Sequence, residues 1–398
     1  MIFRRYRLSA AVLVTLAASA LPFPAATASA TPRPSAVTEA VQRDADALRD
    51  AGVTGVAVRL ETPRGVTTVR SGVGDLDSRR PVPKAGYVRF GSTTKTFVAT
   101  VALQLVGEKR LSLDQTVEQL LPGVVSGAGN DGRTITVRDL LQHTSGLPDY
   151  VYDVFPEPSA QTYFANRWRS YRPEQLVALA MRHEPAFPAG TRWAYSNTNY
   201  VLAAMIIEKV TGRTWEQQVH ERILSPLGLR QTDTPGTDPF LPHPHASNYQ
   251  QFAVDGPLAD TTIPYRPFDS GADGSMTGTA RDLNRFFAAL AGGKLLERAE
   301  LAVMRATVPV PQDSGHPAGT EAGLGLFFTP LSCGSGYIGH GGSGFGYVIR
   351  SATTTDGRRT VTVSAHSRSA DPQSAARQED ALNDLIDHAL CGTTQAGR

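Results

Sequence analysis

Apolar positions recur at helical spacing over residues 37–51, near the start of the chain. Two strand-like runs follow at 55–60 and 65–70, and the Pro63-Arg-Gly segment between them is typical of a turn. This pattern predicts a helix followed by a β-hairpin.

The C-terminal part of the chain carries the same elements in reverse order. Strand-like runs at 347–352 and 360–365 flank a turn at Asp356-Gly357, and a helical pattern follows from about residue 375 to 390. Strands at both ends of a chain with helices between them suggest one sheet with an insertion. We therefore expect an α/β plus all-α fold, in which a single antiparallel sheet is flanked by the terminal helices and the middle of the chain forms an inserted helical domain.

The middle of the chain is mostly helical in pattern. Apolar stripes predict helices at 97–106 and 200–210, and Thr136 with Asp139 has the spacing of a capping box. Residues 232–270, rich in Pro, Asp and Thr, predict an irregular loop region.

Two domains follow from these elements, with the active site expected at their interface. We assign residues 31–91 and 271–398 to the α/β sheet domain, and residues 92–270 to the mostly helical domain. The chain has 398 residues, of which 41% are hydrophobic, so it is long and apolar enough to bury a large core.

Residues 1–30 are predicted to be a secretory signal peptide. A basic start with an Arg4-Arg5 pair precedes an apolar stretch at 8–21, and Ala28-Ser29-Ala30 forms a small-residue cleavage site. A membrane anchor is the alternative reading, but Pro22 ends the stretch short of the ~20 apolar residues that span a bilayer. We expect a secreted, extracellular protein without a membrane anchor.

The charge balance argues against a polyanionic partner. The chain has 39 Lys and Arg against 37 Asp and Glu, a formal net charge of +2, which leaves no electrostatic footprint for nucleic acid. Only five of the basic residues are lysines, so a lysine inside a motif is unusually informative.

The chain has two cysteines, Cys333 and Cys391, which lie 58 positions apart. In an exported protein an even count is best explained by a disulfide, which would contribute about 4 kcal/mol through loop-closure entropy. Two buried free thiols are the alternative.

The first candidate for chemistry is Gly91-Ser92-Thr93-Thr94-Lys95, which follows a strand-like segment where a helix begins. One helical turn separates Ser92 from Lys95, so the amine can reach the serine oxygen and act as its base. The alternative is a structural one, with Ser92 as a helix N-cap and Lys95 as a solvated residue. A lysine near a helix N-terminus opposes the helix dipole, which weakens that alternative.

Two further motifs complete a recognisable order. Tyr195-Ser-Asn197 stands just before a predicted helix, and His340-Gly-Gly342 stands just before a predicted strand. A tyrosine hydroxyl near the lysine can move a proton, and an asparagine amide can hold a substrate carbonyl. Each motif alone could also be a loop turn or a bulge. The order S-x-x-K, Y-x-N, H-x-G is that of the serine penicillin-recognising enzymes.

On these motifs the chain resembles the serine beta-lactamase and penicillin-binding superfamily, and within it the secreted D-alanyl-D-alanine carboxypeptidases of actinomycetes. The resemblance covers essentially the whole mature chain and implies a beta-lactamase/transpeptidase-like fold. The other segments that carry it are Ile135-Thr-Val-Arg-Asp-Leu140, His143-Thr-Ser-Gly-Leu147, Gly323-Leu-Gly-Leu326 and Leu331-Ser-Cys-Gly334.

The resemblance also implies roles for individual residues. Ser92 would be the acylated nucleophile, Lys95 its base partner, Tyr195 the proton shuttle, and Asn197 a ligand of the substrate amide. His340 would frame the third wall of the site. The remaining candidates for substrate binding are Gly341, Gly342, Ser343, Phe155 and Phe327, with the backbone N–H groups of Ser92 and Ser343 as an oxyanion hole. The matching cysteines of that family are bridged.

Two departures put the substrate in question. The carboxypeptidases carry an arginine that binds the substrate's terminal carboxylate, and Phe327 stands at that position here. They also carry a hydroxyl residue where this chain has Gly341. Arg350 can replace the lost contact only if it points into the cleft. Histidine-Gly-Gly is the form met in related D-aminopeptidases and esterases.

Other classes of protein fit less well. No serine has the G-x-S-x-G context of a lipase, and the absence of any lysine after Lys294 excludes the K-T-G motif of a true beta-lactamase. His243-Pro-His245 lacks further metal ligands and indicates a surface loop, so we expect no metal and no cofactor.

We therefore expect a monomeric serine hydrolase working through an acyl-enzyme, first as a D-alanyl-D-alanine carboxypeptidase on peptidoglycan-type peptides. The alternatives are an esterase or D-stereospecific aminopeptidase or amidase, and a penicillin-binding module without turnover. The expected partners are a small peptide or ester substrate containing a D-amino acid, and beta-lactams as acylating inhibitors.

Overall fold

The computed structural model describes Met1, Ala11 and residues 35–236, 238–268 and 271–392. The predicted signal peptide, except for Met1 and Ala11, lies outside the described residues. Residues from Ser35 onward form one compact unit.

An antiparallel sheet of eight strands organises this unit, in the order β2-β1-β14-β13-β12-β11-β10-β9. The strands that the sequence pattern predicts at both ends of the chain pair within it, because β1 lies directly beside β14. The single antiparallel sheet is therefore confirmed. Its strands are β1 (Gly55–Thr62), β2 (Gly65–Gly72), β9 (Val308–Pro309), β10 (Glu321–Ala322), β11 (Phe327–Pro330), β12 (Gly336–Gly344), β13 (Tyr347–Thr354) and β14 (Thr360–Ala365).

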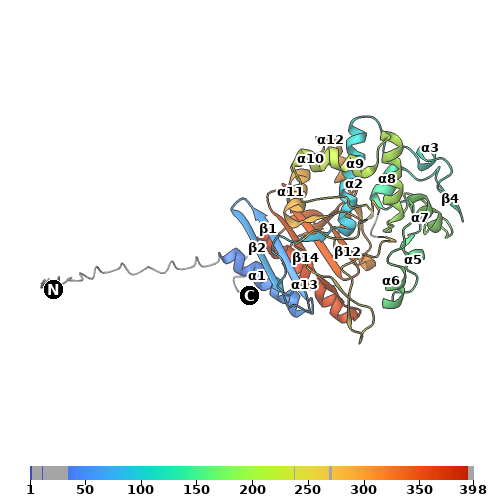
Figure 1. Ribbon diagram of the computed structural model, residues 1–398. Coiled ribbons are helices and arrows are strands. Elements are labelled where there is room, and N and C mark those ends of the chain that lie inside the picture. The colour runs from blue at the N-terminus through green and yellow to red at the C-terminus, as the bar shows by residue number, and fades with distance from the viewer. Residues whose placement is uncertain (2–10, 12–34, 237, 269–270, 393–398) are drawn as a thin grey trace. The chain divides into compact units, whose positions relative to one another are not determined.

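The terminal helices α1 (Ala36–Asp50) and α13 (Pro372–Cys391) pack on each other and on one face of the sheet (Figure 1). Val361 and Val363 of β14 point into their shared apolar core. Thr362, between these two valines, points to the opposite face, where its hydroxyl donates to Asn284 Oδ1 at 2.7 Å. Asn284 belongs to α11 (Ala280–Ala291), so helices cover both faces of the sheet.

The inserted segment is helical, as expected, and its largest core surrounds α2 (Thr94–Gly107). This helix is almost wholly buried, which fits a helix at the centre of a packed unit. The predicted capping box is present: Thr136 Oγ1 accepts from the Asp139 N–H, and the Asp139 carboxylate accepts from the Thr136 N–H. The other helices of this segment are α3 (Val117–Leu120), α4 (Val137–Gln142), α5 (Val151–Val154), α6 (Ala160–Asn166), α7 (Pro173–Ala180), α8 (Thr198–Thr211), α9 (Trp215–Val219), the π-helix η2 (His220–Leu224) and α10 (Ser225–Leu227), together with the 3₁₀ turn that carries Ser92. Helix α12 (Arg298–Met304) follows later in the chain.

The segment 232–270 contains more regular structure than its composition predicts. Strands β6 (Tyr249–Gln251) and β7 (Leu258–Asp260) form a small sheet with β15 (Ser367–Arg368). The strands are only two or three residues long and pair with a distant segment, so no alternating pattern marks them in the sequence. The boundaries between the two proposed domains stay a prediction.

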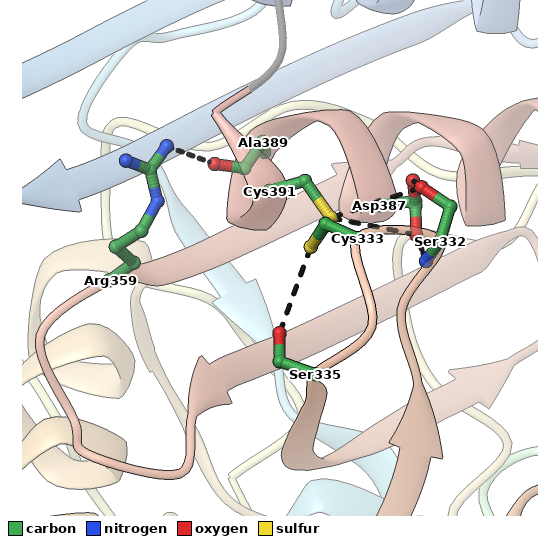
Figure 2. Close-up of a disulfide and its surroundings, with 7 residues drawn as sticks. All are labelled: Ser332, Cys333, Ser335, Arg359, Asp387, Ala389 and Cys391. Atoms are coloured by element: carbon green, nitrogen blue, oxygen red, sulfur yellow. Dashed lines mark hydrogen bonds between the residues drawn. A yellow bond between two sulfur atoms is a disulfide. The ribbon is translucent and has the colours of Figure 1, made fainter.

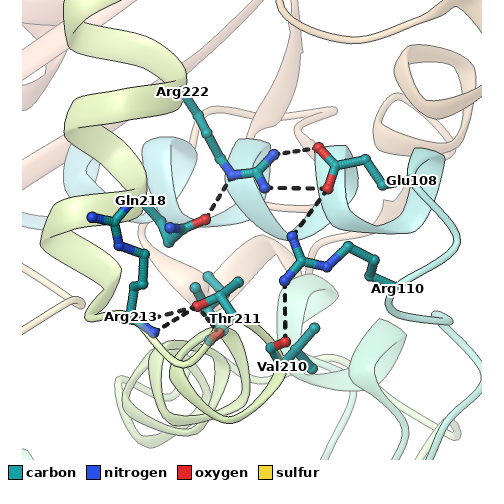
Figure 3. Close-up of polar contacts among 8 residues, drawn as sticks. Glu108, Arg110, Val210, Thr211, Arg213, Gln218 and Arg222 are labelled. Atoms are coloured by element: carbon teal, nitrogen blue, oxygen red, sulfur yellow. Dashed lines mark hydrogen bonds and ion pairs between the residues drawn. The ribbon is translucent and has the colours of Figure 1, made fainter.

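A surface network joins the ends of three helices in the inserted segment (Figure 3). Arg222 pairs with the Glu108 carboxylate, with Nη2 at 3.2 Å from Oε2, and its Nε donates to Gln218 Oε1 at 2.7 Å. Arg110 donates to the Val210 carbonyl at 3.2 Å. Exposed ion pairs contribute about 0–1 kcal/mol each, so this network fixes positions more than it stabilises the fold.

A disulfide joins Cys333 to Cys391, which ties the turn after β11 to the end of α13 (Figure 2). The Ser332 N–H donates to the Asp387 carboxylate at 2.7 Å beside it. On the same helix end, Arg359 donates to the Ala389 carbonyl at 2.6 Å. Helix α13 is thereby held against the sheet near β12.

Among the described residues, we find no helix that has both the length and the apolar character needed to cross a membrane.

Candidate active site

The candidate nucleophile sits at the junction between the short strand β3 (Tyr87–Arg89) and α2. A single 3₁₀ turn, η1 (Gly91–Thr93), connects the two elements and contains Ser92. Gly91 has φ +48°, a left-handed conformation that other residues rarely adopt. The turn therefore projects Ser92 into a cavity at the edge of the sheet.

Lys95 is fully buried and makes three contacts with its amine. Its Nζ lies 3.1 Å from Ser92 Oγ, 2.7 Å from Asn197 Oδ1 and 2.6 Å from the Asp273 carbonyl oxygen. An ammonium group has three donors, so these partners account for all of them. The structural alternative, in which Lys95 is a solvated residue, is therefore wrong.

Tyr195 lies on the other side of this amine, with its ring centroid 5.0 Å from Lys95 Nζ. Its hydroxyl is buried and has no hydrogen-bond partner within the part of the chain that the structure describes. A buried hydroxyl without a partner costs about 1–3 kcal/mol, a penalty that a substrate atom bonding there would relieve.

His143 has no role that its sequence motif predicts, although the motif belongs to the resemblance. The His143 ring stacks on Tyr195 at 4.2 Å between centroids and 25° between planes. Its Nδ1 accepts from the Ser196 N–H at 3.2 Å and lies 3.1 Å from Asn199 Nδ2, which places the ring proton on Nε2. Burial, reinforced by the positive charge of Lys95, holds the pKa of His143 well below its usual value. The neutral ring supports Tyr195 from behind.

Asn197 connects Lys95 to a buried acid that sequence analysis also missed. While its Oδ1 accepts from Lys95, its Nδ2 donates to Asp149 Oδ2 at 2.8 Å. Burial raises the pKa of Asp149. Burial raises the pKa of Asp273 as well, and that carboxylate accepts from the Tyr150 hydroxyl at 2.7 Å. Both amide atoms of Asn197 are therefore engaged in holding the site together.

The His340-Gly-Gly motif lies inside β12, a strand that the sequence pattern did not predict, and β13 follows directly after it, as expected. Five of the nine residues of β12 are glycines, which have a low strand propensity, but its backbone pairs with β13 from Tyr337 to Gly344. His340 Nδ1 donates to the Gly341 carbonyl at 2.5 Å. Burial, with Lys95 as a second cause, lowers the pKa of His340 to about 3, so the ring is neutral.

Gly342 brings the edge of β12 against the nucleophile turn. A Cβ at this position would lie 2.0 Å from the Phe90 carbonyl oxygen and 2.9 Å from the Ser92 nitrogen, so only glycine fits. The approach places the segments that carry the two predicted oxyanion donors, the N–H groups of Ser92 and Ser343, side by side.

A cavity of about 310 Å³ opens beside these groups. Tyr195, Gly341 and Phe327 line it, and the Phe327 ring packs 5.0 Å from His340. Phe155 does not line this cavity and instead packs edge-on against Phe345 at 4.6 Å. The lining residues are Ser92, Tyr195, Ser314, Gly315, His316, Pro317, Phe327, Thr329, Tyr337, Gly339, His340, Gly341, Gly342, Ser343, Arg350, Ser351, Ala352 and Ile386.

The loop with His243 and His245 contributes nothing to this cavity, and His245 Nδ1 lies 3.0 Å from the Pro242 carbonyl. Nowhere among the described residues do three or more His, Cys, Asp or Glu side chains gather in an arrangement that could hold a metal ion.

Two histidines of the candidate site, His143 and His340, are buried and neutral, so we expect the fold to be sensitive to acid. In the unfolded chain, His143 and His340 bind protons below a pKa near 6.5, whereas in the folded chain they stay neutral to much lower pH. Above pH 6.5 both rings are neutral in the folded and in the unfolded chain, so they do not make stability depend on pH. As the pH falls from 6.5 towards the folded-state pKa, about 3 for His340, the unfolded chain binds protons that the folded chain does not, and the free energy of unfolding decreases.

We expect each of them to lower the free energy of unfolding by about 1.4 kcal/mol per pH unit in that window. Urea titrations at pH 7, 6 and 5 measure the slope. His340→Asn should reduce the slope by one proton. An unchanged slope in His340→Asn would contradict the prediction.

Comparisons with known proteins agree with this geometry. A model of the beta-lactamase family matches residues 37–385. Penicillin-binding protein 4 of Amycolatopsis lactamdurans is 27% identical over 318 residues, which are 77% of this chain and 80% of that protein. A D-aminopeptidase of Cereibacter sphaeroides is 26% identical over 332 residues, covering 82% of this chain but 59% of that protein.

Two solved structures share the fold over nearly all of the unit. A D-stereospecific amidohydrolase from Streptomyces sp. superposes with a TM-score of 0.80 at 38% identity, over 90% of this chain and 99% of that one. A D-amino acid amidase from Ochrobactrum anthropi SV3, complexed with L-phenylalanine amide, gives 0.73 at 26% identity, over 88% and 100%. The predicted superfamily and fold are confirmed, and the chain belongs to the beta-lactamase family of serine hydrolases.

Proposed function

We propose that this protein hydrolyses an amide or ester bond on the carbonyl side of a D-amino acid, through an acyl-enzyme on Ser92. The observation that carries the proposal is the placement of Lys95. When its amine is neutral, two N–H groups donate to Asn197 Oδ1 and the Asp273 carbonyl, and the lone pair faces Ser92 Oγ at 3.1 Å. An amine held in this way is a base for the serine proton.

The remaining steps use groups that face the same cavity. Ser92 attacks the substrate carbonyl, and the N–H groups of Ser92 and Ser343 stabilise the oxyanion. The Tyr195 hydroxyl then protonates the departing nitrogen or oxygen, and the same residue activates the water that hydrolyses the acyl-enzyme.

The preference for a D-amino acid is supported by the relatives. Two similar structures are described as a D-stereospecific amidohydrolase and a D-amino acid amidase. D-Alanyl-D-alanine carboxypeptidase activity is a narrower member of this class. The apolar Phe327, at the position of the carboxypeptidase arginine, favours the broader assignment.

A matched set of substrates tests the proposal. We expect hydrolysis of D-alaninamide and of a short aryl ester, with kcat/KM for D-alaninamide about 10- to 100-fold above that for L-alaninamide. A diacyl-L-Lys-D-Ala-D-Ala peptide tests the carboxypeptidase reading in parallel. Equal rates for the two enantiomers would overturn the D-specificity.

Beta-lactams are proposed as acylating inhibitors of Ser92. A fluorescent penicillin should label the protein and compete with turnover of the aryl ester. Labelling without turnover of any substrate would instead favour a penicillin-binding module. Export is proposed from the pattern of the first thirty residues, and the N-terminus of the protein recovered from culture medium tests it.

A further inference from the structure

Asn197 lies between two groups with opposite hydrogen-bonding character. Its Oδ1 accepts from Lys95 Nζ at 2.7 Å, and its Nδ2 donates to Asp149 Oδ2 at 2.8 Å. A carboxylate can only accept hydrogen bonds, so the opposite orientation of the amide would set Asn197 Oδ1 against a second acceptor. Asp149 therefore selects one of the two orientations that the Asn197 amide could take at this place.

The residues on either side of Asn197 are tied to the segment that carries Asp149. The hydroxyls of Ser196 and Thr198 both donate to the Pro148 carbonyl, at 3.2 and 2.7 Å. The other carboxylate oxygen of Asp149, Oδ1, accepts from the backbone N–H two residues further along at 3.1 Å. Burial raises the pKa of the Asp149 carboxyl, whereas its hydrogen bonds from N–H groups lower it, because they stabilise the charged form. The carboxylate is thus held in a fixed position beside the amide.

The orientation of Asn197 decides what the amine of Lys95 can do. In the orientation observed, a neutral amine donates to Asn197 Oδ1 and, over 2.6 Å, to the Asp273 carbonyl. Its lone pair then faces Ser92 Oγ at 3.1 Å. In the opposite orientation, Asn197 Nδ2 would donate to this lone pair, and the base would no longer be available to the serine proton.

We propose that Asp149 is a positioning residue: it acts through Asn197 and keeps the lone pair of Lys95 free for the serine proton. Asp149 is not among the residues that line the cavity beside Ser92, which separates its role from that of a substrate ligand. An amide nitrogen carries two hydrogens, and Asp149 takes one of those on Asn197, so the second is left for the substrate carbonyl that Asn197 is expected to bind. This inference rests on the proposed function, because it concerns the base of the same reaction.

Asp149→Asn tests this role with a side chain of the same size. The substituted side chain has one oxygen in place of two, so it cannot accept both hydrogen bonds of the carboxylate. Where that oxygen stays on the backbone N–H, the new nitrogen faces Asn197 and favours the opposite orientation. We expect kcat for D-alaninamide to fall by about 10- to 100-fold, part of the usual contribution of a general base, with KM within about 3-fold. Pre-steady-state acylation by a nitrophenyl ester should slow by the same factor, because Ser92 must lose its proton with either substrate.

Asp153→Asn is the matched control. It makes the same substitution on the same segment, at a carboxylate that pairs with Arg182 at 2.6 Å. We expect kcat and KM of this variant to match those of the wild type. An equal loss of kcat in both variants would mean that the substitutions only loosen the segment, and it would overturn the positioning role.

A neutron crystal structure of the wild type tests the orientation directly, whether or not Asp149→Asn folds. We expect two exchangeable hydrogens on the Asn197 atom that faces Asp149 and none on the atom that faces Lys95. The reverse arrangement overturns the role of Asp149, as does unchanged acylation in a folded Asp149→Asn. If the wild type hydrolyses no D-substrate, the proposed function fails instead, and this result is distinct because the orientation of the amide is measured without a substrate.

Discussion

Ser92→Ala is expected to lower kcat/KM by about 10⁴- to 10⁶-fold on every substrate that the wild type hydrolyses. The substitution removes the only atom that can carry the acyl group, while the rest of the site keeps its contacts. Lys95 still donates to Asn197 Oδ1 and to the Asp273 carbonyl, so the buried amine keeps two hydrogen-bond acceptors. We therefore expect the free energy of unfolding to change by less than about 1 kcal/mol.

Steady-state rates on D-alaninamide and on an aryl ester, together with mass spectrometry after exposure to penicillin, provide the measurement. The wild type should gain the mass of one acyl group and the variant none. Ser126→Ala, at an exposed position of the two-residue strand β4 (Ser126–Gly127), is the matched control and should retain full activity. Wild-type turnover in Ser92→Ala would exclude the acyl-enzyme at this position.

The outline of the fold was predictable because its terminal elements follow simple periods. Side chains alternate along β1 and β14 because one face of these strands packs on α1 and α13 and the other face packs on α11. Such an alternation within one strand is visible in the sequence itself. Strand β12 was not predictable in this way. Its glycines contribute no pattern, and its conformation depends on pairing with neighbouring strands and on the close approach of Gly342 to the turn at Ser92.

The same distinction applies to the candidate site, where contacts between residues close in the sequence were predictable and contacts between distant segments were not. Ser92 and Lys95 are one helical turn apart, so their contact could be read from spacing alone. The groups that hold Lys95 and Tyr195 in place come from distant segments. Lys95 donates to a backbone carbonyl, that of Asp273, which any residue type could provide, and His143 stacks on Tyr195 from another element. Such contacts exist only after folding and leave no spacing to detect.

Two positions of the cavity, Phe327 and Gly341, have to be considered together with the residue on the neighbouring strand. Phe327 presents an aromatic ring on one wall of the cavity, and Gly341 presents no side chain on the next. The space at Gly341 is then filled by Arg350 from the neighbouring strand. Read separately, the two departures suggest that charge recognition is lost, whereas the fold places a positive charge in the same cavity.

Tyr195→Phe is expected to slow amide hydrolysis by about 10²- to 10⁴-fold, the usual contribution of a positioned acid or base. The variant keeps the ring that stacks on His143 and faces Lys95, and it removes a hydroxyl that has no partner among the described residues, so stability should be unchanged or slightly raised. The effect should depend on the leaving group. An amine must be protonated to leave, whereas a nitrophenolate leaves unaided.

Pre-steady-state kinetics on D-alaninamide and on a nitrophenyl ester separate the two steps that Tyr195 serves. With the amide, acylation itself should slow. With the ester, acylation should remain fast and deacylation should become limiting, so that a burst of nitrophenolate precedes a slow steady state. Tyr152→Phe, at a position that is 77% exposed, is the control and should behave as the wild type. Equal slowing of both substrates without a burst would contradict the assignment of Tyr195 as the proton shuttle, because a general loss of site geometry affects acylation of the ester as strongly as that of the amide.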